Sequence, residues 1–255
     1  MIVLREDRGP VAWLTLNRPA QRNALSQPLM AALHEALDTI EAERAIRVVV
    51  LAGVGPAFCA GHDLREVQAL GREGHTAIFA QCSALMQRIV TLRVPVIARV
   101  HGIATAAGCQ LVATCDLAVA GVSARFATPG VNIGLFCSTP MVALSRAVGR
   151  KAAMAMLLTG EMVDAAEAVR IGLVNEAVAD AALDGAVEAL AKRIASRSPA
   201  SVALGKPAFY TQAEMPLAEA YAYASRVMVE NMQAADAAEG IGAFLERREP
   251  VWGDG

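Results

Sequence analysis

A loop of small residues between an apolar strand and a helix constrains this chain more than any other feature. Residues 95–100 (PVIARV) predict a buried strand, and residues 109–114 (CQLVAT) predict the start of a helix. Between them lie residues 101–108 (HGIATAAG), whose small side chains leave backbone N–H groups bare at the helix entrance. Unpaired N–H groups and the helix dipole both favour negative charge at such a point. The segment therefore predicts a strand-to-helix turn that can hold an oxyanion.

A second turn of the same kind lies upstream. Residues 48–53 (VVVLAG) predict a strand, and residues 58–64 (FCAGHDL) predict a turn that leads into a polar helix. Glycine in one such turn alone is explained as well by tight packing. Two turns that each offer one N–H to the same carbonyl oxygen are what an enzyme needs to stabilise an enolate or a tetrahedral anion.

The order of predicted elements indicates an α/β fold. Strands are predicted near residues 1–5, 11–17, 47–53, 96–100, 115–120 and 174–178, and helices near 26–43, 76–92, 108–113, 140–158, 164–170 and 180–197. Strand signals end at Ser198, and three prolines punctuate a helical tail whose main helix is predicted at about 214–235. We expect an α/β core over residues 1–197 and a C-terminal helical region over residues 198–255, to which the family resemblance described below assigns a role in oligomerisation.

Composition narrows the class of protein. With 55% hydrophobic and 4% aromatic residues in 255, the chain has a sizeable core of small apolar side chains. The net charge of −2 and scattered arginines argue against a nucleic-acid partner, and charged or polar residues interrupt every candidate membrane span. The five cysteines lack C-x-x-C spacing, which indicates reduced thiols and no metal site. Residues 1–8 become acidic before a signal peptide could form, so we expect a cytoplasmic protein.

Short motifs follow one another in a fixed order along nearly the whole chain. They are LNRP (16–19), RNAL (22–25), FCAGHDL (58–64), the loop 101–109, CDL (115–117), FATP (126–129), TGE (159–161), GLV (172–174) and residues 240–247. This order resembles the enoyl-CoA hydratase/isomerase family, also called the crotonase superfamily. Residues 104–113 and 127–132 are similar to a divergent branch, the enoyl-CoA hydratase domain-containing protein three group. The resemblance implies a crotonase-like spiral of ββα units with a C-terminal helical extension that assembles a homo-trimer or hexamer.

The resemblance also implies roles for individual positions. The backbone N–H groups of His62 and Ala107 would form the oxyanion hole for the thioester of an acyl-CoA, which would be substrate or ligand rather than a prosthetic group. Four positions would contact CoA: the carbonyl of Ala60 at the adenine, Arg65 near the phosphates, and Phe244 and Arg247 at the adenine end of a neighbouring subunit's site. A surface arginine is equally explained as a solvated side chain.

One departure from the family pattern bears on the chemistry. Family hydratases use two glutamates, one that activates water and one that protonates the α-carbon, and these positions are Gln110 and Gly130 here. A glutamine amide does not titrate in the working pH range, and glycine has no side chain. Loss of a general acid or base costs about 10²–10⁴ in rate. We therefore expect hydration to be weak or absent.

Other side chains are candidates for the missing groups. Some family members place a carboxylate at the position of Ser138, where this chain has Cys137 and Ser138 instead. Cys137 is either a nucleophile or a small buried apolar residue. His62 is either a proton carrier through its imidazole or a donor through its main chain alone. Asp63 is best explained as a residue that ties down its loop or helix start.

Two classes of function remain. The first is an enzyme of the lyase or isomerase class that acts on an acyl-CoA through an oxyanion intermediate, by isomerisation, thioester cleavage, decarboxylation or weak hydration. The second is a catalytically silent acyl-CoA-binding or regulatory protein. The intact loops fit both classes, and we favour the first.

Overall fold

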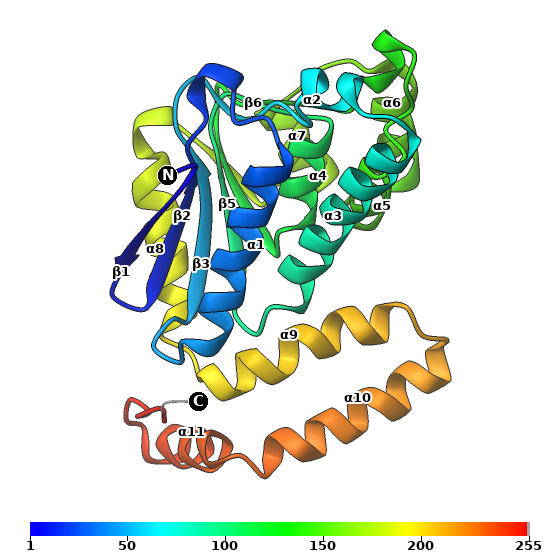
Figure 1. Cartoon of the computed structure of the whole chain (residues 1–255). Coiled ribbons are helices and arrows are strands. Elements are labelled where there is room, and N and C mark those ends of the chain that lie inside the picture. The colour runs from blue at the N-terminus through cyan, green and yellow to red at the C-terminus, as the bar shows by residue number, and fades with distance from the viewer. Residues whose placement is uncertain (254–255) are drawn as a thin grey trace.

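The computed structural model describes residues 1–253 and arranges their strands in two sheets (Figure 1). The larger sheet has the order β1 (Val3–Arg8), β2 (Val11–Leu16), β3 (Val48–Gly53), β5 (Val96–Val100), β7 (Leu117–Gly121) and β10 (Glu176–Val178). The smaller sheet has the order β4 (Ala57–Cys59), β6 (Ile103–Thr105), β8 (Arg125–Ala127) and β9 (Val163–Asp164). The pairs β3/β4, β5/β6 and β7/β8 each place one strand in each sheet, which confirms the predicted spiral of ββα units.

Helices follow these strand pairs and then form the C-terminal tail. Their bounds are α1 (Gln27–Ala42), α2 (Leu64–Ala69), α3 (Arg72–Thr91), α4 (Ala107–Thr114), α5 (Pro140–Ala147), α6 (Arg150–Thr159), α7 (Ala165–Ile171), α8 (Leu183–Ala195), α9 (Pro199–Ala213), α10 (Leu217–Met232) and α11 (Ala235–Glu246), with short 3₁₀ turns at Pro19–Gln21, Pro129–Ile133 and Asp180–Ala182. The predicted helix over 140–158 is wrong in one respect, because the chain leaves the helix at Val148–Gly149 and starts again at Arg150.

Alternate residues of β3 pack into two hydrophobic cores on opposite faces of the larger sheet. Val48 and Val50 pack in the cluster that contains Leu183 and Val187 of α8. Val49 belongs to the cluster on the other face, which α1, α3 and α4 cover. This two-residue period explains why β3 is apolar throughout: a strand covered on both faces has no solvent side.

The four strands of the smaller sheet were not predicted. β4, β6 and β8 have three residues each and β9 has two, so none is long enough to show an alternating pattern. They form because each lies beside a partner: Ala104 of β6 is in register with Cys59 of β4 and with Phe126 of β8. The smaller sheet is therefore a product of the spiral rather than of local sequence.

The tail is divided into three helices. The predicted main helix at 214–235 corresponds to α10, which α9 precedes and α11 follows, with a break at residues 214–216 and a second at 233–234. Proline restricts the residue before it to extended backbone, which accounts for the first break at Pro216. Pro207, in contrast, lies inside α9. The boundary at residue 197 and the oligomerisation role of the tail stay predictions.

A buried lysine joins the tail to the core. The Lys206 ammonium of α9 donates to the carbonyls of Ile89 and Val94 at 2.9 Å each, and lies 2.8 Å from the Asp116 carboxylate. Asp116 also accepts a hydrogen bond from the Tyr210 hydroxyl at 2.9 Å. These contacts fix the direction in which α9 leaves the core, below the sheets in Figure 1.

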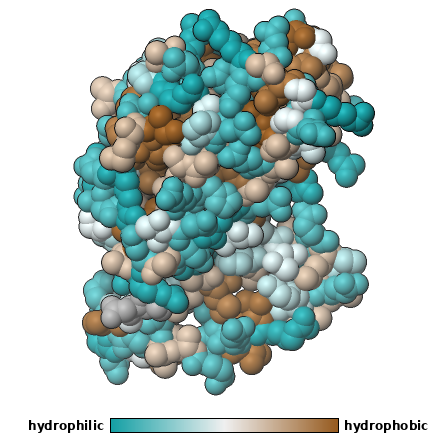
Figure 2. All heavy atoms as spheres, in the orientation of Figure 1, coloured by the Kyte–Doolittle hydropathy of each residue, from teal (hydrophilic) through white to brown (hydrophobic). Residues whose placement is uncertain are grey.

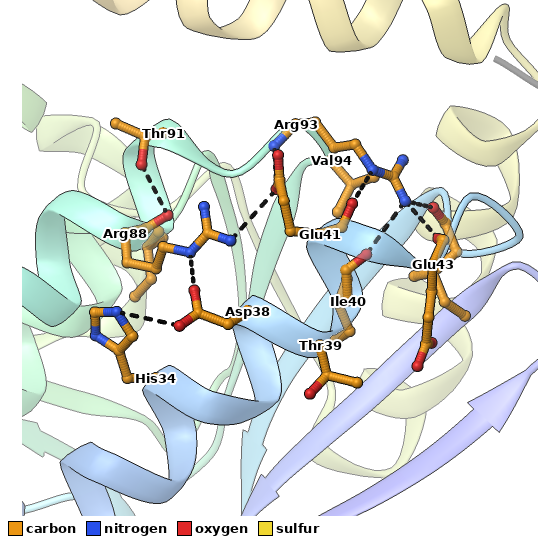
Figure 3. A network of polar contacts seen from close by, with 12 residues as sticks. His34, Asp38, Thr39, Ile40, Glu41, Glu43, Arg88, Thr91, Arg93 and Val94 are labelled. Carbon is orange, nitrogen blue, oxygen red and sulfur yellow. Dashed lines mark hydrogen bonds and ion pairs between the residues drawn. The ribbon is translucent and has the colours of Figure 1, made fainter.

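A second polar contact closes the end of α1 (Figure 3). The Arg93 guanidinium donates to the carbonyls of Ile40, Glu41 and Ile46 at 3.2, 3.0 and 3.1 Å and also to that of Glu43. The last carbonyls of a helix have no partner within the helix. Arg93 lies in the segment that leads into β5 and donates to carbonyls at this helix end, so it anchors α1 against the sheet.

Replacing Arg93 with methionine tests this anchor. Arg93→Met keeps apolar bulk but leaves several carbonyls without a donor, so we expect the free energy of unfolding in urea to fall by about 2 kcal/mol. The matched control is Arg44→Met, at an exposed position on the same turn, for which we expect a change below about 0.5 kcal/mol. Equal effects of the two substitutions would contradict the anchoring role.

Candidate active site

The two loops singled out from the sequence are in direct contact. A Cβ on Gly61 would lie 2.9 Å from Cβ of Ala106 and 3.0 Å from the carbonyl oxygen of Thr105. A Cβ on Gly108 would lie only 2.0 Å from the carbonyl oxygen of Cys59. No side chain fits in either gap, so glycine at both positions lets the loop after β4 and the first turn of α4 touch through their backbones.

Two backbone N–H groups at this contact have no acceptor among residues 1–253. The Leu25 N–H donates to the Gly61 carbonyl at 2.7 Å, and the Leu25 carbonyl accepts the Asp63 N–H at 3.2 Å. These two bonds hold the backbone on either side of His62, whose own N–H is left unused. Ala107 is the first residue of α4, where a helix has no internal acceptor for the N–H. The arrangement suits an anionic oxygen at this contact.

The residue before Ala107 has a strained backbone. Ala106 has φ 50° and ψ −118°, a region that residues other than glycine seldom adopt. Such a conformation costs on the order of 1–3 kcal/mol and persists only where the surroundings enforce it. Here the Ala106 N–H donates to the Ala127 carbonyl at 2.9 Å, and Gly61 packs against its side chain. Nothing in the sequence signals this strain, because alanine is an ordinary residue in a segment of small side chains.

Neither family glutamate position carries a proton-transferring group. Gln110 is 4% exposed on α4, with its Oε1 at 4.0 Å from the Cys82 sulfur of α3. At Gly130 a Cβ would lie 2.8 Å from the Leu135 carbonyl oxygen and 2.9 Å from the Cys137 sulfur. The space through which a side chain would leave Gly130 is thus filled by the chain that follows it.

Cys137 and Ser138 lie beside this filled position. Cys137 is 7% exposed, and burial raises the pKa of its thiol, which keeps it protonated. This favours the packing interpretation over the nucleophilic one. The exposed Ser138 hydroxyl donates to the Phe136 carbonyl at 3.3 Å. The catalytic roles expected for these two residues stay untested predictions.

Asp63 ties down its loop by a different contact from the one predicted. It precedes α2, but its side chain makes no capping hydrogen bond there. Instead the Arg18 guanidinium binds the Asp63 carboxylate at 3.0 Å and the Ala24 carbonyl at 2.7 Å, and this hydrogen bond lowers the pKa of Asp63. Arg18 is a site residue that sequence reasoning missed, although it lies in the LNRP motif.

The His62 side chain lies against α3. Its ring meets that of Phe79 edge-on, with centroids 5.4 Å apart and planes at 85°. Both ring nitrogens are shielded from solvent and have no hydrogen-bond partner among the described residues. Burial lowers the pKa of the imidazole, so the ring is neutral near pH 7. Phe79 is a second residue of this site that the sequence did not indicate.

The residues expected to contact CoA are not brought together within one chain. The Ala60 carbonyl lies at the loop contact and accepts the Thr105 hydroxyl at 3.1 Å, and Arg65 is exposed on α2. Phe244, 82% exposed, and Arg247 lie on or just after α11, at the opposite end of the molecule from α2 (Figure 1). A second copy of the chain is needed to place them near one site.

Residues 1–253 contain neither a metal-binding cluster nor a helix that could span a membrane. No group of three or more histidine, cysteine or acidic side chains is arranged to hold a metal ion. None of the helices is both long and apolar enough to span a membrane.

Comparison with known proteins identifies the family. The sequence profile of the enoyl-CoA hydratase/isomerase family matches residues 6–255. Rattus norvegicus enoyl-CoA hydratase domain-containing protein 3, mitochondrial, is 49% identical over 241 residues, 94% of this chain and 80% of the relative. The Mycobacterium smegmatis enoyl-CoA hydratase structure has a TM-score of 0.97 at 54% identity and covers 99% of each chain. The human enoyl-CoA hydratase domain-containing protein 3 structure has a TM-score of 0.96 at 44% identity, over 99% of this chain and 100% of that one.

These relatives contradict the expected cellular location and confirm the family assignment. The rat, frog and human relatives are named mitochondrial, so the predicted cytoplasmic location is wrong. The physical reason is that composition does not encode a compartment, which is read from targeting segments. The motifs, the ββα spiral, the paired backbone loops and the match over residues 6–255 agree, and this chain belongs to the enoyl-CoA hydratase/isomerase family.

Proposed function

We propose that the chain binds acyl-CoA thioesters and stabilises negative charge on the thioester oxygen with the backbone N–H groups of His62 and Ala107. The observation that carries this proposal is the contact of Gly61 and Gly108 with the opposite loop, which brings two unused N–H groups together. Relatives named enoyl-CoA hydratase support the choice of ligand class. Each donor of this kind is typically worth about 10²–10³ in rate.

The CoA part would be bound between two copies of the chain. Ala60 and Arg65 would come from one copy, and Phe244 and Arg247 from its neighbour. Support comes from the tail, where a groove of about 300 Å³ lies between α9 and α10. Its lining includes Phe209 and Met228, which are 62% and 59% exposed, and Figure 2 shows apolar atoms gathered there. We propose a homo-trimer or hexamer in which a second copy covers this groove.

The chemistry would stop short of efficient hydration. Gln110 and Gly130 hold no titratable group, and the Leu135 carbonyl and Cys137 sulfur occupy the exit from Gly130. An oxyanion held at the backbone donors fits isomerisation, decarboxylation or thioester cleavage better than addition of water. The same filled position also fits a silent acyl-CoA-binding protein, which the measurements below distinguish from an enzyme.

Ligand binding is tested by thermal unfolding with acetyl-, crotonyl- and octanoyl-CoA. At about 100 times the Kd, a ligand should stabilise the folded chain by about 2.7 kcal/mol. Gly108→Ala should abolish this shift, because its Cβ would collide with the Cys59 carbonyl and push α4 away. Gly149→Ala, where a Cβ meets open space, is the control that keeps the shift. An unchanged melting temperature with all three thioesters would refute the proposed site.

Hydration is tested with crotonyl-CoA by loss of its enoyl absorbance. We expect a rate lower than that of a competent family hydratase by about 10²–10⁴ for each missing group. Gln110→Glu combined with Gly130→Glu should not recover activity, since the new side chain at 130 collides with backbone. Replacing residues 130–137 of this chain with the corresponding segment of a family hydratase, together with Gln110→Glu, should raise the rate. A native turnover of about 10 per second would show that other residues supply the protons.

Assembly is tested by sedimentation at micromolar concentration. We expect three or six subunits for the native chain and dissociation for Phe209→Glu, because a carboxylate would be buried in the apolar groove. Ala189→Glu, at an exposed position of α8, is the matched control and should sediment like the native chain. A monomeric native chain would remove the proposed roles of Phe244 and Arg247.

A further inference from the structure

The two ring nitrogens of His62 are shielded from solvent and make no hydrogen bond within residues 1–253. Most buried polar groups in folded proteins have a partner, and one left alone costs about 1–3 kcal/mol. His62 is also the residue whose backbone N–H is unused at the loop contact. An unpaired side chain on the same residue as an unpaired donor indicates that a molecule from outside the chain meets both.

The surroundings of the ring leave it free to exchange a proton. Phe79 of α3 meets the ring edge-on, and the Leu25 backbone and the Glu66 carboxylate of α2 lie close enough to influence it. Glu66 is itself occupied, since it accepts the Gln27 N–H at 3.1 Å. Burial lowers the pKa of the imidazole, which is therefore neutral near pH 7 with one bare nitrogen able to take a proton.

The other titratable side chains near the loops are poorly suited to that role. Burial raises the pKa of the Cys59 and Cys82 thiols to about 12 each, so neither is a base at neutral pH. The Asp63 carboxylate is held in an ion pair with Arg18 at 3.0 Å. Among the described side chains at this contact, His62 is therefore the one suited to gain and release a proton near neutral pH.

We propose that the His62 imidazole moves the α-proton of an acyl-CoA whose thioester oxygen is held by the two backbone N–H groups. This inference rests on the proposed function. The α-carbon is two bonds from that oxygen, and the imidazole belongs to the residue that supplies one of the two donors. The bare ring nitrogen takes the α-proton, the C–H electron pair forms the carbon–carbon double bond of the enolate, and the negative charge moves to the oxygen. The imidazolium then returns a proton to the α-carbon.

The test is exchange of α-protons with solvent. Butyryl-CoA and octanoyl-CoA, which are saturated and have no double bond to hydrate, are incubated with the protein in D₂O at saturating concentration, and deuterium at the α-carbon is measured by mass spectrometry. The native chain should exchange faster than buffer. His62→Ala keeps the backbone N–H and should lower the saturated rate by about 10²–10⁴. His75→Ala is the control, because that ring is already occupied by the Val67 carbonyl at 2.9 Å, and this variant should exchange like the native chain.

Rescue separates proton transfer from a structural role. Imidazole added to His62→Ala should restore exchange in proportion to its concentration, which a purely structural histidine would not allow. His62→Gln gives a second variant if the alanine variant does not fold. Calorimetry with the same thioesters is run in parallel. Absence of native binding overturns the proposed function, whereas native binding without exchange, or equal exchange by the histidine variants, overturns this inference alone.

Discussion

The contact between the backbone of β4 and the first turn of α4 is the constraint on which the site depends. Gly108 lies so close to the Cys59 carbonyl that a methyl group would overlap it, and a Cβ on Gly61 would lie 2.9 Å from that of Ala106. The smaller sheet places these segments side by side, since β4 and β6 are its adjacent parallel strands. Without that approach, the N–H groups of His62 and Ala107 would open to separate regions of solvent.

Keeping the contact costs free energy that the surroundings offset. Ala106 adopts a backbone conformation suited to glycine, which costs on the order of 1–3 kcal/mol. Its N–H is bound to Ala127, and the opposite loop is held by the Leu25 backbone and by the Arg18–Asp63 ion pair. These links come from segments distant in sequence. The strain therefore persists because several elements enforce it at once, as at many functional sites.

At Gly130 the absence of a carboxylate is accompanied by a filled space and not only by the loss of a side chain. The chain after Gly130 turns back so that the Leu135 carbonyl and Cys137 sulfur fill the place of a side chain. Gln110 is buried, and its side chain contacts the Cys82 thiol, whose pKa burial raises to about 12. Under the proposal made above, proton transfer at this site falls to the imidazole of His62, whose ring nitrogens have no partner among the described residues.

The sequence alone determined the features that depend on local pattern. Apolar strands such as β3, both small-residue turns, the family and the missing carboxylates were all predicted from it. Tertiary structure decided what depends on distant partners: the short strands of the smaller sheet, the filled space at Gly130 and the unpaired ring of His62. The reason is physical, because periodicity and capping act within a few residues, whereas close approach and burial arise only when remote segments pack together.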